Sequence, residues 1–217
     1  NERSEAESGV VLDIVAPVVT VNTLSTNDST PVITGTVNEA MDVVSVSVNG
    51  QIYSATVFDM IWIAQVTNVL PDRSYDVSVD AIDLAENHGF DSTLMELTID
   101  TTAPVVTINN LRVSTAPYIL TGTVSDRRST VRITVNGVSR NARVTGNTWR
   151  LVITSTLADG VYNVTARAID SIGNVGVDST SNELEIDTTP PSAVSGITLL
   201  SATDNILIQW SAVTASD

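Results

Sequence analysis

The sequence contains no cysteine and no lysine, and it has a single histidine. Without cysteine there is no disulfide scaffold, so the stability of any fold must come from packing alone. No apolar run approaches the ~18 residues that a membrane-spanning helix needs, which excludes a helical membrane span. Gly-x-Ser-x-Gly, phosphate-loop and zinc-ligand spacings are absent as well. The lone His88 is expected in a solvated loop, and we therefore predict that the chain is not an enzyme and has no catalytic residues.

What the sequence does contain is an internal repeat. Asp13–Thr20 returns as Asp100–Thr107, and the first residues of this motif return again from Asp187, each time 87 residues later. Residues 13–99 and 100–186 align without a gap, and 35 of the 87 aligned positions are identical. Such a period lies in the size range of independent domains. We predict two modules, the first repeat (residues 13–99) and the second repeat (100–186). Residues 1–12 are then the closing strand of a preceding module or an amino-terminal extension.

The charge differs between the two repeats. Overall, ten arginines stand against 25 acidic residues, and the formal net charge is −15. The first repeat holds 12 acidic residues and one arginine, whereas the second holds seven acidic residues and eight arginines. This is not the basic footprint of a nucleic-acid-binding domain, so no nucleic-acid partner is expected. An acidic, cysteine-free chain fits a secreted or bacterial cell-surface protein, and we expect an extracellular location.

Short runs that alternate apolar and polar residues predict β-strands throughout both repeats. Residues 44–48 and 131–135 alternate in this way, and both runs end in Asn-Gly, the strongest short hairpin signal. The corner at Leu157–Tyr162 is similar to the tyrosine corner of immunoglobulin-like sandwiches. About seven strands fit in each repeat, so the predicted fold class is all-β, with tandem immunoglobulin-like sandwiches of antiparallel strands. Phe58, Ile61 and Ile63 fit no core pattern and either pack on a neighbour or mark a contact surface.

Residues 187–217 differ from both repeats. Pro190-Pro191 followed by the alternating run before Trp210 is similar to the opening two strands of a fibronectin type III module. Two strands cannot form a stable sandwich. Either the module continues beyond residue 217, which we favour, or another chain completes it. The partners expected are therefore neighbouring modules of the same chain, with self-assembly through unpaired terminal strands as a further hypothesis.

Carboxylates are expected to converge at the amino-terminal end of each sandwich. The loop between the sixth and seventh strands and the arriving linker lie there, and the loop after the second strand adds one more acid. Ca²⁺ binds six to eight oxygen ligands in flexible geometry and would relieve the repulsion between such carboxylates. Plain turn chemistry also explains aspartates in these loops. The candidate ligands are Asp13, Glu39, Asp83 and Asn87 at the first junction, and Asp100, Asp126, Asp170 and Asn174 at the second.

Several motifs together resemble the bacterial immunoglobulin-like repeats of giant surface adhesins. They are the Asp-Thr-Thr-Ala-Pro linker, the Thr-Gly-Thr-Val strand, the Val-Asn-Gly hairpin, the Gly-Asn-Thr-Trp strand start at residues 146–149 and the Ala-x-Asp-x-x-Gly-Asn loop at 168–174. The resemblance implies a secreted stalk whose linkers are stiffened by calcium. The first repeat departs from the pattern with Glu86 in place of the glycine and with Phe58-Asp59-Met60-Ile61 in place of Thr-Gly-Asn-Thr.

The predicted function is therefore a non-catalytic extracellular spacer of a bacterial repeat protein, an adhesin in the first instance. Two alternatives stay open at this point. Immunoglobulin-like and fibronectin-like modules also separate the domains of secreted polysaccharide-degrading enzymes. A chain with unpaired strands at both ends could instead build an extracellular filament by strand complementation.

Overall fold

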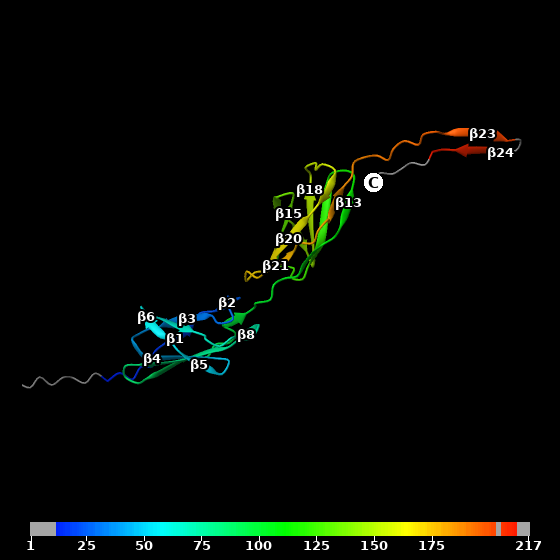
Figure 1. Cartoon of the computed structure of the whole chain (residues 1–217). Helices are drawn as coiled ribbons and strands as arrows, with labels where there is room; N and C mark the ends of the chain where they lie inside the picture. The colour runs from blue at the N-terminus through cyan, green and yellow to red at the C-terminus, as the bar shows by residue number, and fades with distance from the viewer. Residues whose placement is uncertain (1–11, 203–204, 212–217) are drawn as a thin grey trace, which may run out of the picture. The chain divides into compact units, whose positions relative to one another are not determined.

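The computed structural model describes residues 12–202 and 205–211, and all the regular secondary structure in them is β-strand (Figure 1). The predicted all-β fold class is confirmed. The boundary between two compact units falls between Pro104 and Val105, and the segment Ile169–Val175 groups with the first unit. Residues 1–11, where the sequence suggests a closing strand or an extension, lie outside the described residues. No helix in the described part of the chain is long and apolar enough to cross a membrane.

The first repeat contains two four-stranded sheets and one small sheet. One sheet has the order β1 (Val19–Val21), β3 (Val32–Val37), β7 (Ile61–Gln65) and β6 (Thr56–Phe58). The other has the order β10 (His88–Asp91), β9 (Val77–Asp83), β4 (Met41–Val48) and β5 (Gln51–Ser54). The small sheet joins β2 (Leu24–Thr26), β11 (Leu97–Ile99) and β8 (Arg73–Tyr75). Because β5 pairs with β4 and β6 pairs with β7, the chain crosses from one sheet to the other at Ala55.

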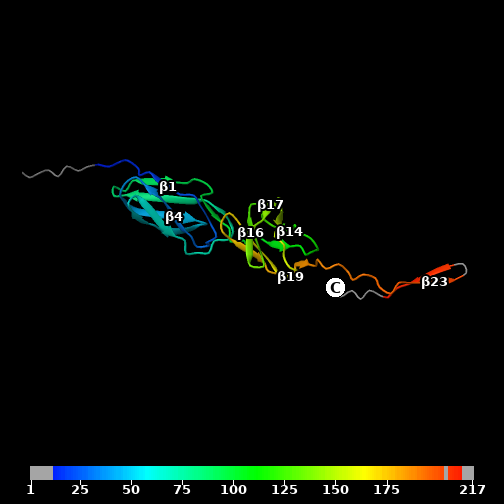
Figure 2. The same cartoon turned by 90° about the horizontal axis from the view of Figure 1, so that it is seen from above.

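The second repeat has the same topology (Figure 1 and Figure 2). Its first sheet has the order β12 (Val106–Ile108), β14 (Tyr118–Val124), β18 (Thr148–Ile153) and β17 (Arg143–Thr145). Its second sheet has the order β16 (Val138–Asn141), β15 (Thr130–Val135), β20 (Val164–Ile169) and β21 (Val175–Asp178). The small sheet joins β13 (Leu111–Val113), β22 (Leu184–Ile186) and β19 (Gly160–Tyr162).

One pairing in each repeat departs from the antiparallel pattern expected from the sequence. β2 runs parallel to β11, and β13 runs parallel to β22. The first strand of each sandwich is split, so that its first half pairs in one sheet and its second half pairs with the last strand of the repeat. Segments of three residues carry no readable alternation, which is why the sequence pattern did not reveal this pairing.

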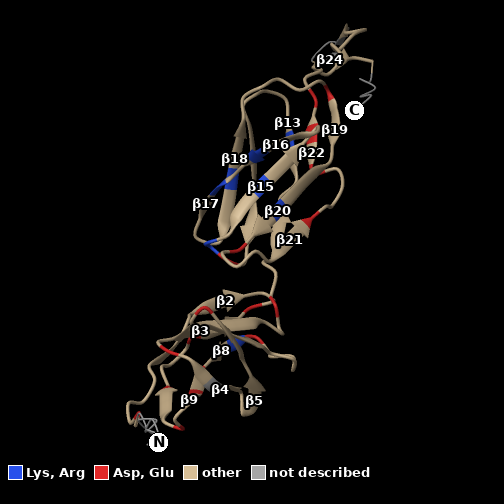
Figure 3. Ribbon diagram, turned by 90° about the vertical axis from the view of Figure 1, so that its left-hand side faces the viewer, with Lys and Arg blue, Asp and Glu red and all other residues tan. Residues whose placement is uncertain are grey.

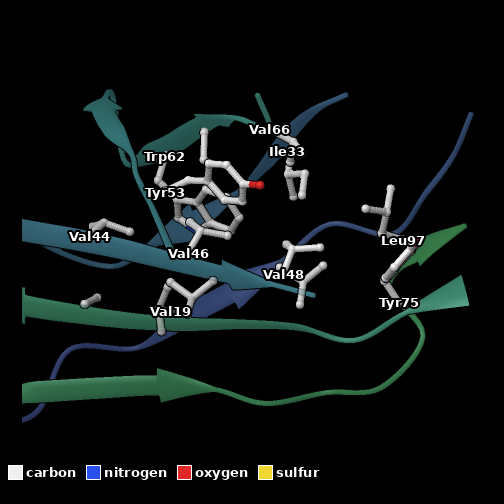
Figure 4. Packing of buried hydrophobic residues seen from close by; sticks show 14 of the residues in the cluster. Val19, Ile33, Val44, Val46, Val48, Tyr53, Trp62, Val66, Tyr75 and Leu97 are labelled. Carbon is white, nitrogen blue, oxygen red and sulfur yellow. The ribbon is translucent and has the colours of Figure 1, made fainter. Parts of the chain in front are cut away.

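A buried tryptophan organises each core. Trp62 and Trp149 are 0% and 1% exposed, and Figure 4 shows Trp62 beside Tyr53 over the valines of β4. The indole N–H of Trp62 donates to the carbonyl of Thr20 at 2.9 Å, and Trp149 makes the same bond to Thr107 at 2.9 Å. A tryptophan N–H must find an acceptor when the ring is buried. This bond ties the edge strand of each sheet to the core.

Glycine is required under each indole ring. A Cβ atom on Gly35 would lie 1.9 Å from the carbonyl oxygen of Thr20 and 2.4 Å from the ring of Trp62. Gly35 and its counterpart Gly122 are the glycines of the repeated Thr-Gly-Thr-Val motif. This explains the glycine in the motif, because the indole ring and the carbonyl of the edge strand leave no room for a side chain there. No positive φ is involved, since the space alone excludes a side chain.

The turn and corner signals of the sequence are confirmed. Asn49 and Gly50 have φ angles of 51° and 75°, and both join β4 to β5 as a tight hairpin turn. The hydroxyl of Tyr75 donates to the carbonyl of Pro71 at 2.7 Å, which is the bond of a tyrosine corner. The second repeat makes the corresponding bond from Tyr162 to Ala158 at 2.8 Å.

A buried glutamate precedes the last strand of each repeat. Glu96 and Glu183 are 3% and 1% exposed. One carboxylate oxygen accepts the backbone N–H of Val77 or Val164, at 3.0 and 2.8 Å. The other oxygen has no hydrogen-bond partner among the described residues. The donating N–H group belongs to the first residue of β9 or β20, where the chain passes from the small sheet to a four-stranded sheet.

The chain after the second repeat forms a hairpin of β23 (Thr198–Ala202) and β24 (Asn205–Gln209). Trp210, which follows β24, is 61% exposed, and Ile206 and Leu199 are 75% and 69% exposed. This is the segment in which the sequence suggests the opening of a fibronectin type III-like module. That assignment stays a prediction.

Candidate metal-binding and linker sites

The loop between β9 and β10 is closed by one aspartate and one asparagine. The Oδ1 atom of Asp83 accepts the backbone N–H groups of Ala85 and Asn87 at 2.8 and 2.9 Å, and its Oδ2 accepts the side-chain amide of Asn87 at 2.9 Å. Asp83 is 2% exposed. Glu86 sits in this loop at φ 67°, where the second repeat has Gly173 at φ 108°. The departure at Glu86 therefore keeps the left-handed turn.

The equivalent loop of the second repeat is built in the same way. Asp170 Oδ1 accepts the backbone N–H groups of Ile172, Gly173 and Asn174 at 2.7–2.9 Å. Its Oδ2 accepts the side-chain amide of Asn174 at 2.9 Å. Such bonds are those expected of aspartate in turns, so these two residues have a structural role whether or not a cation is bound.

Each loop asparagine also holds the arriving linker. The side-chain amide of Asn87 donates to the carbonyl of Asp13 at 3.2 Å, and that of Asn174 donates to the carbonyl of Asp100 at 2.8 Å. The structure thus brings together the linker aspartate and the loop residues that the sequence singles out. The contact is made through the linker backbone, which sequence reasoning did not specify.

Three carboxylates converge at the first junction. Asp13, Glu39 and Asp83 each place one carboxylate oxygen within 4.8 Å of the others, and no other such group of acids is found in the described residues. Their exposure runs from exposed at Asp13 through intermediate at Glu39 to buried at Asp83. A set of oxygen-only donors at this spacing suits Ca²⁺. The donor chemistry at the first junction therefore fits the cation that the sequence suggests.

The remaining candidate ligands make local turn contacts. Asp126, the counterpart of Glu39, accepts the backbone N–H of Arg128 at 3.0 Å and the hydroxyl of Ser129 at 3.2 Å. The side chain of Asp100 accepts the N–H of Thr102 at 3.1 Å, and that of Asp13 accepts the N–H of Val15 at 3.0 Å. Both linker aspartates thus form a turn with the residue two places later.

A second linker contact was not predicted from the sequence. Asp72 accepts the backbone N–H and the hydroxyl of Thr101 at 3.0 and 2.8 Å, and the hydroxyl of Thr102 at 2.6 Å. Asp159 holds Thr188 and Thr189 in the same way, at 2.7–3.0 Å. The signal was present, because an aspartate recurs at this position before each of the two linkers that contain Thr-Thr. Each repeat therefore binds the start of the linker that follows it through the hydrogen bonds of one aspartate.

His88, the single histidine, has an acidic and an aromatic neighbour. The sequence places it in a loop, whereas the structure puts it at the start of β10. Its Nδ1 atom lies 3.0 Å from a carboxylate oxygen of Asp80, and its ring stacks on Phe90 with 5.9 Å between the ring centroids. Both contacts lie on the exposed face of the sheet that contains β9 and β10.

Hydrogen bonds lower the pKa of four of these aspartates. The side chains of Thr102 and Thr188 are the main causes at Asp72 and Asp159, and the side chain of Asn87 is the main cause at Asp83. At Asp170 burial is the largest influence and raises the pKa, but the bonds from Asn174 and the loop amides outweigh it, so the pKa is lowered.

This direction predicts a loss of stability in acid. A folded-state pKa below the unfolded value adds stability that is complete above the unfolded pKa and is lost as the pH falls through the folded pKa. We expect the melting temperature to be flat near neutral pH and to fall below about pH 4. In the double variant Asp72→Asn/Asp159→Asn the fall should be shallower. Glu86→Gln, at an exposed carboxylate that takes no part in the linker bonds, is the control. Equal slopes in all three proteins would contradict the role of the linker bonds.

Comparison with known proteins gives one family. The sequence model of a family described as "Bacterial Ig-like domain" matches twice, at residues 20–101 and 106–188. No curated protein is significantly similar in sequence. Among solved structures, the fibronectin(III)-like modules of Clostridium thermocellum CbhA are 13% identical, with a TM-score of 0.46 over 77% of this chain and 92% of theirs. Murine CEACAM1b is 12% identical, with a TM-score of 0.38 over 78% of this chain and 100% of its own.

Proposed function

Because the chain belongs to the bacterial Ig-like domain family, we propose that it is a non-catalytic extracellular spacer within a larger bacterial repeat protein, such as an adhesin. In such a protein the modules would hold a distal binding domain away from the cell. A spacer needs modules that fold separately, and each repeat has its own hydrophobic core. It also needs linkers that limit bending, and the linkers here are short and contain proline.

The observation that carries this proposal is the set of hydrogen bonds on the linker. Asp72 binds Thr101 and Thr102, while the carbonyl of Asp100 accepts the side-chain amide of Asn174. A linker that served only as a flexible tether would need none of these bonds, and its residues would gain entropy by remaining free. Holding consecutive linker residues is what a stiff joint requires.

Calcium is proposed as a second element of stiffness. At the first junction Asp13, Glu39 and Asp83 would hold the ion, with Asn87 keeping the loop and the linker backbone in place. The ion would neutralise three converging carboxylates and link the arriving chain to the loop. Asp100, Asp126, Asp170 and Asn174 are the corresponding residues at the second junction.

Small-angle scattering of the full chain in excess calcium and in chelator tests the proposal. A stiff spacer gives a long, narrow particle in both conditions, and calcium should increase its maximum dimension and narrow the distribution of distances. A compact or freely jointed particle in both conditions would refute the spacer function. An extended particle that does not respond to calcium would refute the metal and leave the spacer standing.

A matched pair of variants locates the calcium effect. Glu39→Gln removes one carboxylate of the cluster and leaves the Asp83 turn intact, because Glu39 takes no part in that turn. Glu86→Gln makes the same change of charge in an exposed residue of the loop between β9 and β10, which contains the Asp83 turn. We expect Glu39→Gln to weaken calcium binding about tenfold or more, measured by calorimetry, since the charge of the ligands sets the affinity. An equal loss in Glu86→Gln would reduce the effect to general electrostatics.

A further inference from the structure

The outer face of one sheet carries different chemistry in the two repeats, although the backbone is the same. In the first repeat Phe58 lies directly opposite Ile61 across β6 and β7, and Thr56 lies opposite Ile63. In the second repeat the same positions form the pairs Thr145 with Thr148 and Arg143 with Arg150. Since both sets are compatible with one fold, neither is required for folding.

The first repeat exposes a contiguous apolar face at this point. Phe58 is 76% exposed, and Ile61 and Ile63 are 45% and 43% exposed. These three residues, called the apolar face below, adjoin one another on β6 and β7. Single exposed apolar side chains are normal, but contiguous ones, here on the edge strand β6 and its neighbour β7, are typical of interaction surfaces.

The turn beside the apolar face has an unfavourable residue. Asp59 and Met60 have φ angles of 47° and 63°. Aspartate tolerates this conformation, but methionine does so at a cost, and Asp-Gly would be the favoured turn sequence. The side chain of Met60 is 49% exposed and adds to the apolar surface. A costly backbone conformation that presents an apolar side chain points to function at this turn.

The second repeat exposes two arginines at the equivalent place. Arg143 and Arg150, called the arginine pair below, are exposed and directly opposite each other. Like charges directly opposite destabilise a sheet. Among the arginines of the described residues only Arg112 has carboxylates within ion-pair distance, at 3.4 Å from Glu185 and 3.5 Å from Asp187. The arginine pair therefore has no internal counterion in this part of the chain. In Figure 3 the ribbon is blue at positions on β17 and β18, whereas the ribbon of the first repeat has almost no blue.

We propose that the apolar face of the first repeat docks on the arginine pair of the second repeat in another copy of this chain. The aliphatic stems of arginine cover apolar surface, and a guanidinium packs over an aromatic ring. The chain already contains such a contact, because the guanidinium of Arg73 lies 4.4 Å from the ring centroid of Tyr75. Phe58 and the neighbouring carboxylate of Asp59 together offer the arginine pair a ring and a counterion.

Charge complementarity selects this pairing of faces. The first repeat carries 12 acidic residues and one arginine, and the second carries eight arginines. Contact between the apolar faces of two first repeats would bring two strongly acidic modules together, and like-charge contact is unfavourable. Contact between a first and a second repeat removes the apolar face from water and supplies the missing counterions. The consequence is lateral association of spacers, which is separate from the proposed spacer function itself.

Sedimentation velocity of the full chain, at concentrations up to about 0.5 mM, measures the association directly. We expect a sedimentation coefficient that rises with protein concentration and falls as salt is raised from about 50 to about 500 mM. The variant Phe58→Thr/Ile61→Thr uses the residues that the second repeat has at these positions, so it should fold. It should weaken association about tenfold or more, as should Arg143→Gln/Arg150→Gln.

Two controls are available on other surfaces. Ile52→Ser removes an equally exposed apolar residue from β5, where the second repeat has serine. Arg132→Gln/Arg167→Gln removes the same charge from the opposite sheet of the second repeat. Both should associate like the unmodified chain. A chain that stays monomeric throughout, or association that strengthens with salt and survives the arginine changes, would overturn the proposal.

Met60→Gly separates function from folding. It creates the favoured Asp-Gly turn, so it should raise the melting temperature of the first repeat and weaken association at the same time. A loss of association in a more stable protein cannot come from misfolding. If neither this variant nor Phe58→Thr/Ile61→Thr changes the association, the apolar face is not the contact and the proposal fails.

Discussion

Replacing Gly122 with alanine should destabilise the second repeat by about 3 kcal/mol or more. The new methyl group would lie 1.9 Å from the carbonyl oxygen of Thr107 and 2.6 Å from the ring of Trp149. Neither neighbour can move freely, because the same carbonyl accepts the indole N–H of Trp149. Relief would require breaking that bond or separating β12 from β14. We expect the amide resonances of the second repeat to lose their native dispersion at a much lower urea concentration, while the unfolding midpoint of the first repeat stays unchanged.

Gly137→Ala is the matched control for this substitution. Gly137 has a φ of 75° and no atom within 4 Å of an added Cβ, so its cost is conformational strain without overlap. That strain is about 1–2 kcal/mol. If Gly122→Ala were no more harmful than Gly137→Ala, the indole would not be packed against the strand as described.

Removing the buried carboxylate of the second repeat should be nearly as damaging. Glu183→Ala leaves the N–H of Val164 without its acceptor and opens a cavity, with an expected cost of about 2–4 kcal/mol. Glu183→Gln keeps an acceptor oxygen and removes a buried charge, one oxygen of which has no partner among the described residues. It should stay within about 1 kcal/mol of the unmodified protein. Urea unfolding of both variants, followed by NMR, measures the difference.

The comparison between these two variants is what matters. A common loss in alanine and glutamine variants would mean that the negative charge, and not the acceptor, is what the site needs. A loss in neither would mean that the N–H of Val164 finds water instead. Glu96 in the first repeat, at 3.0 Å from the N–H of Val77, provides an independent repetition of the experiment.

Local patterns in the sequence were sufficient to predict most strands and the tight turns. Alternation at residues 44–48 corresponds to β4, with Val44, Val46 and Val48 at most 2% exposed. The Asn-Gly dipeptides and the tyrosine corners needed only neighbouring residues to be recognised. The duplication strengthened each of these assignments, because every local signal occurred twice.

Contacts between distant parts of the chain could not be predicted in this way. From the sequence, Glu96 is expected to be a surface residue before a strand. In the structure it is buried and accepts a hydrogen bond from the N–H of Val77, 19 residues earlier. Whether a glutamate is buried there depends on where the chain leaves the small sheet, and no local pattern encodes that. The hydrogen bond from Thr101 to Asp72 joins residues 29 positions apart and was not predicted for the same reason.

The candidate metal site was predicted in part. The sequence named the residues, and the structure brings Asp13, Glu39 and Asp83 together. The sequence analysis did not predict that Asp83 already accepts three hydrogen bonds within its own loop. The loop is therefore formed before any ion arrives, and a cation would find its ligands prepared.

The parallel pairing of β2 with β11 has a mechanical consequence. β2 lies near the start of the first repeat and β11 at its end, and the two strands run in the same direction. A pull on the two ends of the repeat therefore drags these neighbours in opposite directions along their own length. Their hydrogen bonds are loaded in shear and must break together, whereas a hairpin pulled at its open end unzips one bond at a time. The same geometry recurs between β13 and β22, so in each module the last strand is held by bonds that resist extension together.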